Sequence, residues 1–235
     1  MDVPLSQEDA VTPLWLAYKK TPDYKRGLIK AIPAHYPLVE KQERVGLQSI
    51  YTQFIKSLSS TQNAKAELKS RSVGIWLSEW KNMQKMLFMH ILKDCGNWRR
   101  KDVRFGSPGD EEVYHIPSHR DVPREMTALA NSVCQLVNKD LLSNEDKYRD
   151  LAQVHYQFIR IHPFVDGNGR VARVLTDQLA IFFGLPPAMA GYPRHDGKRR
   201  LNYHRAIRAC ADDATCGDLA LWIAGYIEEQ LKLLA

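Results

Sequence analysis

Reactive side chains are concentrated between residues 161 and 173 of this 235-residue chain. His162 supplies an imidazole, Asp166 a carboxylate, and Arg170 and Arg173 supply two guanidinium groups. A neutral imidazole can accept a proton from a hydroxyl near pH 7. A carboxylate can bind Mg²⁺, and arginine can bind a phosphate through two N–H groups at once. Together these residue types favour chemistry on a phosphate-containing substrate.

The residues after Arg170 predict a helix, so the reactive segment leads into a helix N-terminus. There the backbone N–H groups without intrahelical acceptors and the positive end of the helix dipole favour phosphate. Glycines at positions 167 and 169 allow a ligand to approach the backbone closely. The segment is therefore predicted to bind a polyphosphate, although the chain contains no P-loop motif. The helical spacing is carried by Val171, Val174, Leu175, Gln178, Leu179 and Phe182.

From His162 to Arg173 the chain reads His-Pro-Phe-Val-Asp-Gly-Asn-Gly-Arg-Val-Ala-Arg, which resembles the signature of the Fic family. Every defined position of the family pattern is met, including a second arginine three residues after the first. We call residues 162–173 the signature segment. The resemblance extends over about residues 76–230, and the lead-in of the family pattern is matched by Leu151, His155, Phe158 and Ile161.

The resemblance implies a role for each functional residue. His162 is the predicted general base, and Asp166 is the predicted Mg²⁺ ligand. Backbone and amide donors of the Gly-Asn-Gly triplet would contact the phosphates of ATP, and a later tyrosine would stack on adenine. The predicted nucleotide-binding residues are Phe164, Gly167, Asn168, Gly169, Arg170, Arg173 and Tyr203.

Several of these residues also have a purely structural interpretation. His162 could cap a helix or lie in the core, Asp166 could cap the following helix, and Gly-Asn-Gly could form an ordinary turn. Arg173 could lie on a solvated helix face, and Tyr203 could be a core residue. His155 precedes His162 by two helical turns, a spacing that does not suit a pair of metal ligands. We predict a packed, hydrogen-bonded histidine at that position.

By resemblance, the predicted reaction is transfer of AMP from ATP to a Ser, Thr or Tyr hydroxyl of a target protein, with release of pyrophosphate. Gly169 instead of lysine is typical of the AMP-transferring branch of the family. One alternative is another Fic-type reaction, which would transfer phosphate or a different nucleotide, or remove AMP. Another is a non-catalytic basic module that binds nucleic acid. Its candidate residues are Arg99, Arg100, Lys101, Arg104, Lys198, Arg199, Arg200, Arg205 and Arg208.

The composition fits one large domain, or one domain with an extension. Hydrophobic residues form 44% of the chain, which is enough for a buried core. No apolar run reaches the length of a membrane span. The net charge of +6 suits a phosphate ligand, nucleic acid or a solvated surface. The N-terminus has no basic flank of a secretory signal. The four cysteines lack Cys-x-x-Cys spacing, so reduced thiols in a cytoplasmic protein are expected.

The elements that must position the signature segment are predicted to be helices, so the expected fold is all-α with one short β-hairpin. Residues 1–75 are predicted to be an N-terminal helical extension, and residues 76–235 the Fic core domain. Prolines 33 and 37 are expected to interrupt the extension before a helix over 45–58. Further helices are expected over 73–92, from 122, from 143 to the signature segment, after Arg170, over 201–210 and from 217.

Residues 98–117 are predicted to form the hairpin, around a Gly-Ser-Pro-Gly turn at 106–109. A free hairpin edge can add a segment of another protein by strand pairing. This resembles the Fic flap, on which a target protein would dock. A plain surface hairpin is the alternative.

Many Fic proteins block their own site with a helix that contains Ser/Thr-x-x-x-Glu-Gly/Asn. In this chain only Ser107 and Glu111 have the Ser-to-Glu spacing, and they lie in the Pro/Gly turn. We therefore expect no inhibitory helix of the usual form. A constitutively active enzyme, a separate inhibitory partner and a diverged helix within residues 40–75 all stay open, as does a homodimer.

Overall fold

The computed structural model describes residues 36–60, 64–89, 95–103, 115–139, 143–187, 189 and 197–234. Within these residues the protein consists of eight α-helices, and no strand is present. The expected helical class is confirmed. The helices are α2 (Tyr36–Ser60), α3 (Ala64–Ser70), α4 (Val73–Phe88), α6 (Val122–Val137), α7 (Asn144–Ile161), α8 (Asn168–Phe182), α9 (Gly197–Ala209) and α10 (Gly217–Leu234).

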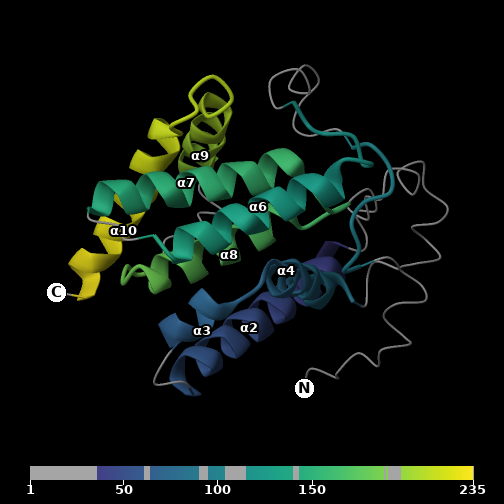
Figure 1. The fold of residues 1–235 in the computed structure, drawn as a ribbon, viewed down its shortest axis with the longest axis horizontal. Coiled ribbons are helices and arrows are strands. Elements are labelled where there is room, and N and C mark those ends of the chain that lie inside the picture. The colour runs from purple at the N-terminus through teal and green to yellow at the C-terminus, as the bar shows by residue number, and fades with distance from the viewer. Residues whose placement is uncertain are drawn as a thin grey trace.

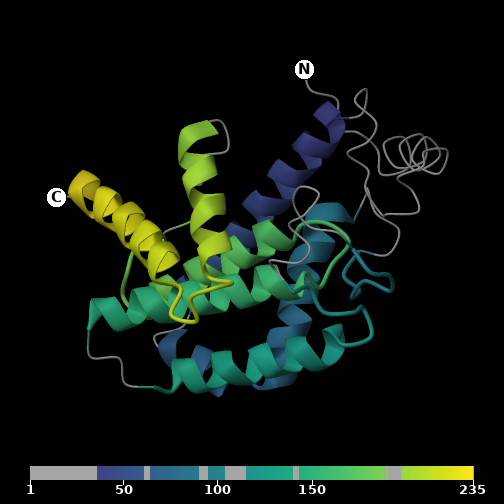
Figure 2. The same ribbon diagram turned by 90° about the horizontal axis from the view of Figure 1, so that it is seen from above.

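The helices form three groups around one core. In Figure 1, α6, α7 and α8 lie in the middle, with α2, α3 and α4 on one side and α9 and α10 on the other. The packing agrees with this arrangement, because α4 contacts both α6 and α8, whereas α10 contacts α7. Figure 2 shows α9 and α10 projecting from the layer that contains α7.

Helix α7 begins and ends where its sequence requires. The Ser143 side chain accepts a hydrogen bond from the Asp146 N–H at 3.1 Å and so caps the N-terminus of the helix. The helix ends at Ile161, before Pro163, whose ring and missing N–H do not suit a helix interior. Its apolar face is buried, including Leu151, Phe158 and Ile161.

Helix α8 carries the arginines of the signature segment and is buried along most of its length. It ends at Phe182, and Gly184 then adopts a left-handed conformation with φ 77°. Glycine has no Cβ and enters this conformation without steric cost. Gly184 therefore marks the C-terminus of α8, and α7 and α8 pack side by side around the loop that joins them.

The N-terminal extension packs into the same core as the remaining helices. Ile50 of α2 and Leu68 of α3 belong to the buried cluster that contains the core of α4, α6, α7 and α8. The expected interruption at Pro37 is wrong, because Pro37 is the second residue of α2. Proline suits the first turn of a helix, where its missing N–H has no intrahelical acceptor. Residue 33 lies outside the described residues.

Most of the predicted hairpin, residues 104–114, also lies outside the described residues. The flanking parts on each side, 98–103 and 115–117, are described and contain no strand. Among the helices of the described structure, none is long and apolar enough to cross a membrane.

Candidate active site

The signature segment begins with a loop, residues 162–167, that joins α7 to α8. Asn168 holds this loop in shape from the first position of α8. Its Oδ1 accepts from the Phe164 N–H at 2.8 Å, and its Nδ2 donates to the Phe164 carbonyl at 2.8 Å. Phe164 is fully buried and packs against Trp98 and Phe158, with ring centroids 4.9 and 6.3 Å apart. The side chains of Phe164 and Asn168 therefore shape the loop from within.

His162 caps the C-terminus of α7 in a left-handed conformation, with φ 49° and ψ 57°. Its Nδ1 lies 3.2 Å from the carbonyl oxygen of Ile159. Since a carbonyl oxygen only accepts, Nδ1 must carry the proton, and Nε2 carries the lone pair. Burial lowers the pKa of His162 to about 4. The charge of Arg99 lowers this pKa further, whereas the Ile159 carbonyl and Asp166 oppose the shift. At neutral pH the imidazole is therefore a neutral base with its basic nitrogen at Nε2.

Asp166 and Gly167 form the turn into α8. Oδ1 of Asp166 accepts from the Gly167 N–H at 2.6 Å, which fixes the orientation of the carboxylate. Gly167 has φ 87°, and a Cβ at this position would lie 2.5 Å from Cε2 of Phe88. Phe88 of α4 is buried beneath the loop. Glycine is therefore required at 167 by backbone conformation and by space, independently of any ligand.

The two arginines of the signature segment lie on the first turns of α8. Nη2 of Arg170 is 3.5 Å from Oδ1 of Asp166, and the guanidinium lies over the Phe88 ring, 5.0 Å from its centroid. Nη1 of Arg173 lies 3.3 Å from the point that a Cβ on Gly169 would occupy. Two positive charges thus lie close to the backbone N–H groups that open α8, an arrangement that suits a phosphate.

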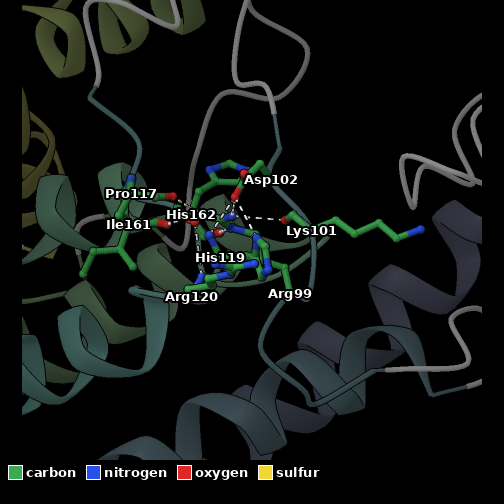
Figure 3. A network of polar contacts seen from close by, with 9 residues as sticks. Arg99, Lys101, Asp102, Pro117, His119, Arg120, Ile161 and His162 are labelled. Atoms are coloured by element: carbon green, nitrogen blue, oxygen red, sulfur yellow. Dashed lines mark hydrogen bonds and ion pairs between the residues drawn. The ribbon is translucent and has the colours of Figure 1, made fainter.

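Three residues outside the signature segment support the loop, and none of them was predicted to do so. Gln84 of α4 is buried and donates to the Asp166 carbonyl at 3.2 Å. The Arg99 side chain donates to the His162 carbonyl at 2.8 Å (Figure 3), and the Arg99 backbone N–H donates to the Pro163 carbonyl at 2.8 Å. Trp98 packs against the buried loop phenylalanine. Sequence spacing gave no signal for these contacts, because the residues lie more than 60 positions from the loop.

Tyr203 of α9 lies in the core in this structure. It is only 2% exposed, and its ring packs against Trp222 with centroids 5.0 Å apart. Its hydroxyl is 2.6 Å from Nε2 of His155, whose Nδ1 is 2.8 Å from Oγ1 of Thr176. Oγ1 of Thr176 donates to the Ala172 carbonyl at 2.8 Å. The prediction of a packed, hydrogen-bonded His155 is confirmed. The position of Tyr203 agrees with the structural alternative, in which this tyrosine is a core residue.

The basic residues that were grouped for nucleic-acid binding do not form one exposed set. Arg99 is 3% exposed, so it belongs to the protein interior and is removed from that group. Arg199 pairs with Glu229, with its two terminal nitrogens each 3.2 Å from a carboxylate oxygen. Arg100 and Lys101 are exposed. This arrangement weakens the hypothesis of a nucleic-acid-binding surface.

A cavity of about 780 Å³ lies among α6, α7 and the turn that joins α9 to α10. Its lining includes Glu125, Gln157 and Arg160, together with Ile161 and His115. It reaches the start of the signature segment through Ile161, and no residue of the segment itself contributes to the lining. The cavity is therefore separate from the N-terminus of α8, where the phosphate-binding groups lie.

The sequence of this chain is similar to the sequences of known proteins. Residues 75–180 match the sequence profile of the Fic/DOC family. Proteins named "Protein adenylyltransferase Fic" are 28% identical over 153 residues in Drosophila erecta and 29% identical in Drosophila melanogaster. In both cases the match covers 59% of this chain and 28% of the relative. This chain therefore corresponds to less than a third of each of these relatives.

The fold is also similar to solved structures. Fic-1 of C. elegans, residues 134–508, superposes with a TM-score of 0.60 at 18% identity, and the match covers 93% of this chain and 61% of that one. The N-terminal FIC domain of Bep8 from Bartonella sp. 1-1C gives a TM-score of 0.55 at 16% identity, with 80% and 85% covered. The helical arrangement around the signature segment is thus shared with Fic structures.

Proposed function

Because the chain carries a Fic/DOC-family domain over residues 75–180, we propose that it is a protein adenylyltransferase, which transfers AMP from ATP to a Ser, Thr or Tyr hydroxyl of another protein. The observation that carries this proposal is the tautomer of His162. Its Nδ1–H is bonded to the Ile159 carbonyl, so Nε2 is the basic nitrogen of a histidine that begins the loop leading into α8. A module that only bound phosphate would not need a base with a fixed tautomer.

The proposed reaction uses groups of the signature segment in defined roles. Nε2 of His162 accepts the proton of the target hydroxyl while the hydroxyl oxygen attacks the α-phosphorus of ATP. A new P–O bond forms to the target, the bond from the α-phosphorus to the β-phosphate oxygen breaks, and pyrophosphate leaves. The backbone N–H groups of Asn168 and Gly169 and the guanidiniums of Arg170 and Arg173 would stabilise the negative charge on the phosphates.

Asp166 is the residue that would hold Mg²⁺. Magnesium in nucleotide sites is usually bound by one or two carboxylates, with substrate phosphates and water as the other ligands. Asp166 fits this requirement, because its carboxylate is oriented by the Gly167 N–H and lies at the N-terminus of α8. No cluster of three or more metal-ligating side chains exists among the described residues, so phosphates and water would complete the coordination. When bound, the ion would neutralise phosphate charge.

The intact mass of the protein after incubation with ATP and Mg²⁺ tests the proposal, with His162→Ala as the matched variant. We expect self-labelling, or labelling of an added protein extract, by one AMP per site in the wild type and none in the variant. A gain of one phosphate would contradict AMP transfer and favour the phosphate-transferring alternative. Labelling that persists in His162→Ala would contradict the role of His162.

The remaining parts of the proposal concern partners and location. The target protein would dock on residues 98–117. The described ends of this segment lie next to His162, because the Arg99 side chain donates both to the His162 carbonyl at 2.8 Å and to the Pro117 carbonyl at 2.5 Å. A cytoplasmic location, a homodimer and a separate inhibitory partner stay predictions from the sequence. A nucleic-acid-binding module is the disfavoured alternative. Its affinity would fall steeply with salt and would not depend on His162.

A further inference from the structure

Arg99 is a buried cation that joins three segments of the chain. Its side chain donates to main-chain carbonyl oxygens of Lys101 at 3.1 Å, of Pro117 at 2.5 Å, and of Ile161 and His162 at 3.4 and 2.8 Å. Figure 3 shows these contacts converging on one guanidinium. The segments therefore meet at one side chain, which lies beside the proposed general base.

The surroundings of Arg99 explain why the residue is arginine. Burial of a charged group is unfavourable unless hydrogen bonds or an opposite charge compensate for the lost water. Among the described residues, the carboxylate in contact is that of Asp102, whose Oδ1 lies 3.5 Å from Nη1 and also accepts from the His119 N–H at 2.7 Å. The other acceptors are carbonyl groups that point in several directions. A guanidinium has five N–H donors in a rigid plane and can serve them at once, whereas lysine has three donors on one atom.

The conformation of His162 shows what this network does for the loop. A left-handed conformation is uncommon for a residue with a Cβ and persists only when its surroundings hold it. The Arg99 side chain holds the carbonyl groups of Ile161 and His162, and its backbone N–H holds the carbonyl of Pro163. These three carbonyls bracket the backbone of His162 on both sides. Their positions determine where the imidazole points.

We propose that Arg99 is a positioning residue, which holds His162 in its left-handed conformation and aligns Nε2 with the target hydroxyl. This inference rests on the adenylyltransferase function proposed above. Arg99 has no direct contact with the nucleotide in this role, so its removal should lower kcat and leave the KM for ATP nearly unchanged. Because Arg99 also binds the carbonyls of Lys101 and Pro117, it fixes the two described ends of the segment on which the target would dock relative to His162.

The test compares Arg99→Lys and Arg99→Met with Arg124→Met, which changes an exposed arginine of α6 outside residues 98–117 and serves as the matched control. We expect kcat for AMP transfer to fall about 100-fold in both Arg99 variants, which is the order of loss that a misplacement of about 1 Å causes. The KM for ATP should change less than about threefold, because Arg99 does not contact the nucleotide and its loss should affect the chemical step and not the binding of ATP. The Arg124→Met variant should match the wild type. Lysine keeps the charge but not the planar set of donors, so Arg99→Lys should not rescue kcat.

A second measurement does not depend on catalysis. In ¹⁵N-histidine-labelled protein, the ring nitrogen signals of His162, assigned from the His162→Ala spectrum, report which nitrogen carries the proton. We expect the wild type and Arg124→Met to show a single Nδ1–H form, and the Arg99 variants to show a mixture of tautomers. If the wild type transfers no AMP, the proposed function fails, and these signals still decide the positioning role. The inference would be overturned if the Arg99→Lys variant folds and keeps the wild-type kcat or the wild-type His162 signals. If Arg99→Met does not fold, the result for Arg99→Lys decides the test.

Discussion

Nδ1 of His162 donates to the carbonyl oxygen of Ile159, one turn back in α7, at a distance of 3.2 Å. This bond and the burial of the ring have opposite effects on the imidazole. The carbonyl stabilises the protonated form, whereas burial destabilises it, and burial has the larger effect, so the pKa of His162 is lowered to about 4. The ring is therefore neutral throughout the physiological pH range, with its lone pair on Nε2.

The first prediction concerns the pH dependence of AMP transfer. A base must be neutral to accept a proton, so activity that depends on His162 should be lost as pH falls through the pKa of about 4. For an ordinary histidine the loss would begin near pH 6.5. We expect the titration of His162 to cause no change in kcat/KM between about pH 5 and 7. The profile should be measured together with circular dichroism at each pH, and a limb near pH 6.5 in protein that is still folded would contradict the lowered pKa of His162.

The second prediction concerns Gly167→Ala. A residue with a Cβ in the left-handed conformation costs roughly 1–2 kcal/mol, and a Cβ at this position would lie 2.5 Å from Cε2 of Phe88. We expect the free energy of unfolding in urea to fall by about 2–4 kcal/mol, since overpacking adds its own cost. Gly225→Ala is the control, because a Cβ at Gly225 meets nothing within 4 Å. The same substitution should also be made in a Phe88→Leu background. If the free energy of unfolding then falls by less, contact with the Phe88 ring accounts for part of the destabilisation, whereas an equal fall would exclude a contribution from that contact.

The third prediction concerns Tyr203→Phe. This change removes the hydroxyl that lies 2.6 Å from Nε2 of His155 and leaves a buried nitrogen without its hydrogen-bond partner. We expect the free energy of unfolding to fall by about 1–3 kcal/mol. Since Phe keeps the ring packed against Trp222, the affinity for ATP should stay within about twofold by calorimetry if Tyr203 acts in the core. Tyr148→Phe is the control, because no hydrogen bond of the Tyr148 hydroxyl is found in the described structure. A large loss of ATP affinity with unchanged stability would favour contact with the nucleotide.

The fourth prediction concerns stability in acid. Burial lowers the pKa of His155 from 6.5 to about 3, and the charge of Arg173 adds to this effect. Between these two values the unfolded chain binds a proton that the folded protein does not, so the free energy of unfolding should fall as pH is lowered from 6.5 toward 3. His162 and His204 contribute with the same sign, because burial lowers the pKa of both. His155→Gln should therefore reduce the slope of stability against pH without abolishing it, and an unchanged slope would contradict the assignment.

The fifth prediction concerns Tyr51→Phe, which tests how the N-terminal extension is attached. The Tyr51 hydroxyl of α2 donates to the buried carboxylate of Asp177 in α8 at 2.6 Å. Loss of a hydrogen bond to a charged group should lower the free energy of unfolding by about 1.5–3 kcal/mol. We expect no gain in AMP transfer, because this contact supports the scaffold of α8. A gain of several-fold in kcat without loss of stability would instead indicate that α2 restrains the site.

The sequence by itself determined the order of the signature residues and indicated most of the helices. The order of His162, Asp166, Arg170 and Arg173 is local, and so are the signals that begin and end helices, such as Ser143 before α7 and Gly184 after α8. Local signals of this kind depend on neighbours within a few residues, which the sequence displays directly. The signature segment and its position between two helices could therefore be predicted.

Only the tertiary structure decided what holds the segment in place. Arg99, grouped by composition with surface cations, is buried against the carbonyl of His162, and Tyr203 bonds His155 in the core. Phe88 lies under Gly167, although nothing in the spacing of these residues connects them. Such contacts join residues tens of positions apart, and they depend on how the helices pack. A sequence pattern records which residues can form a helix, but the packing of several helices determines which side chains meet.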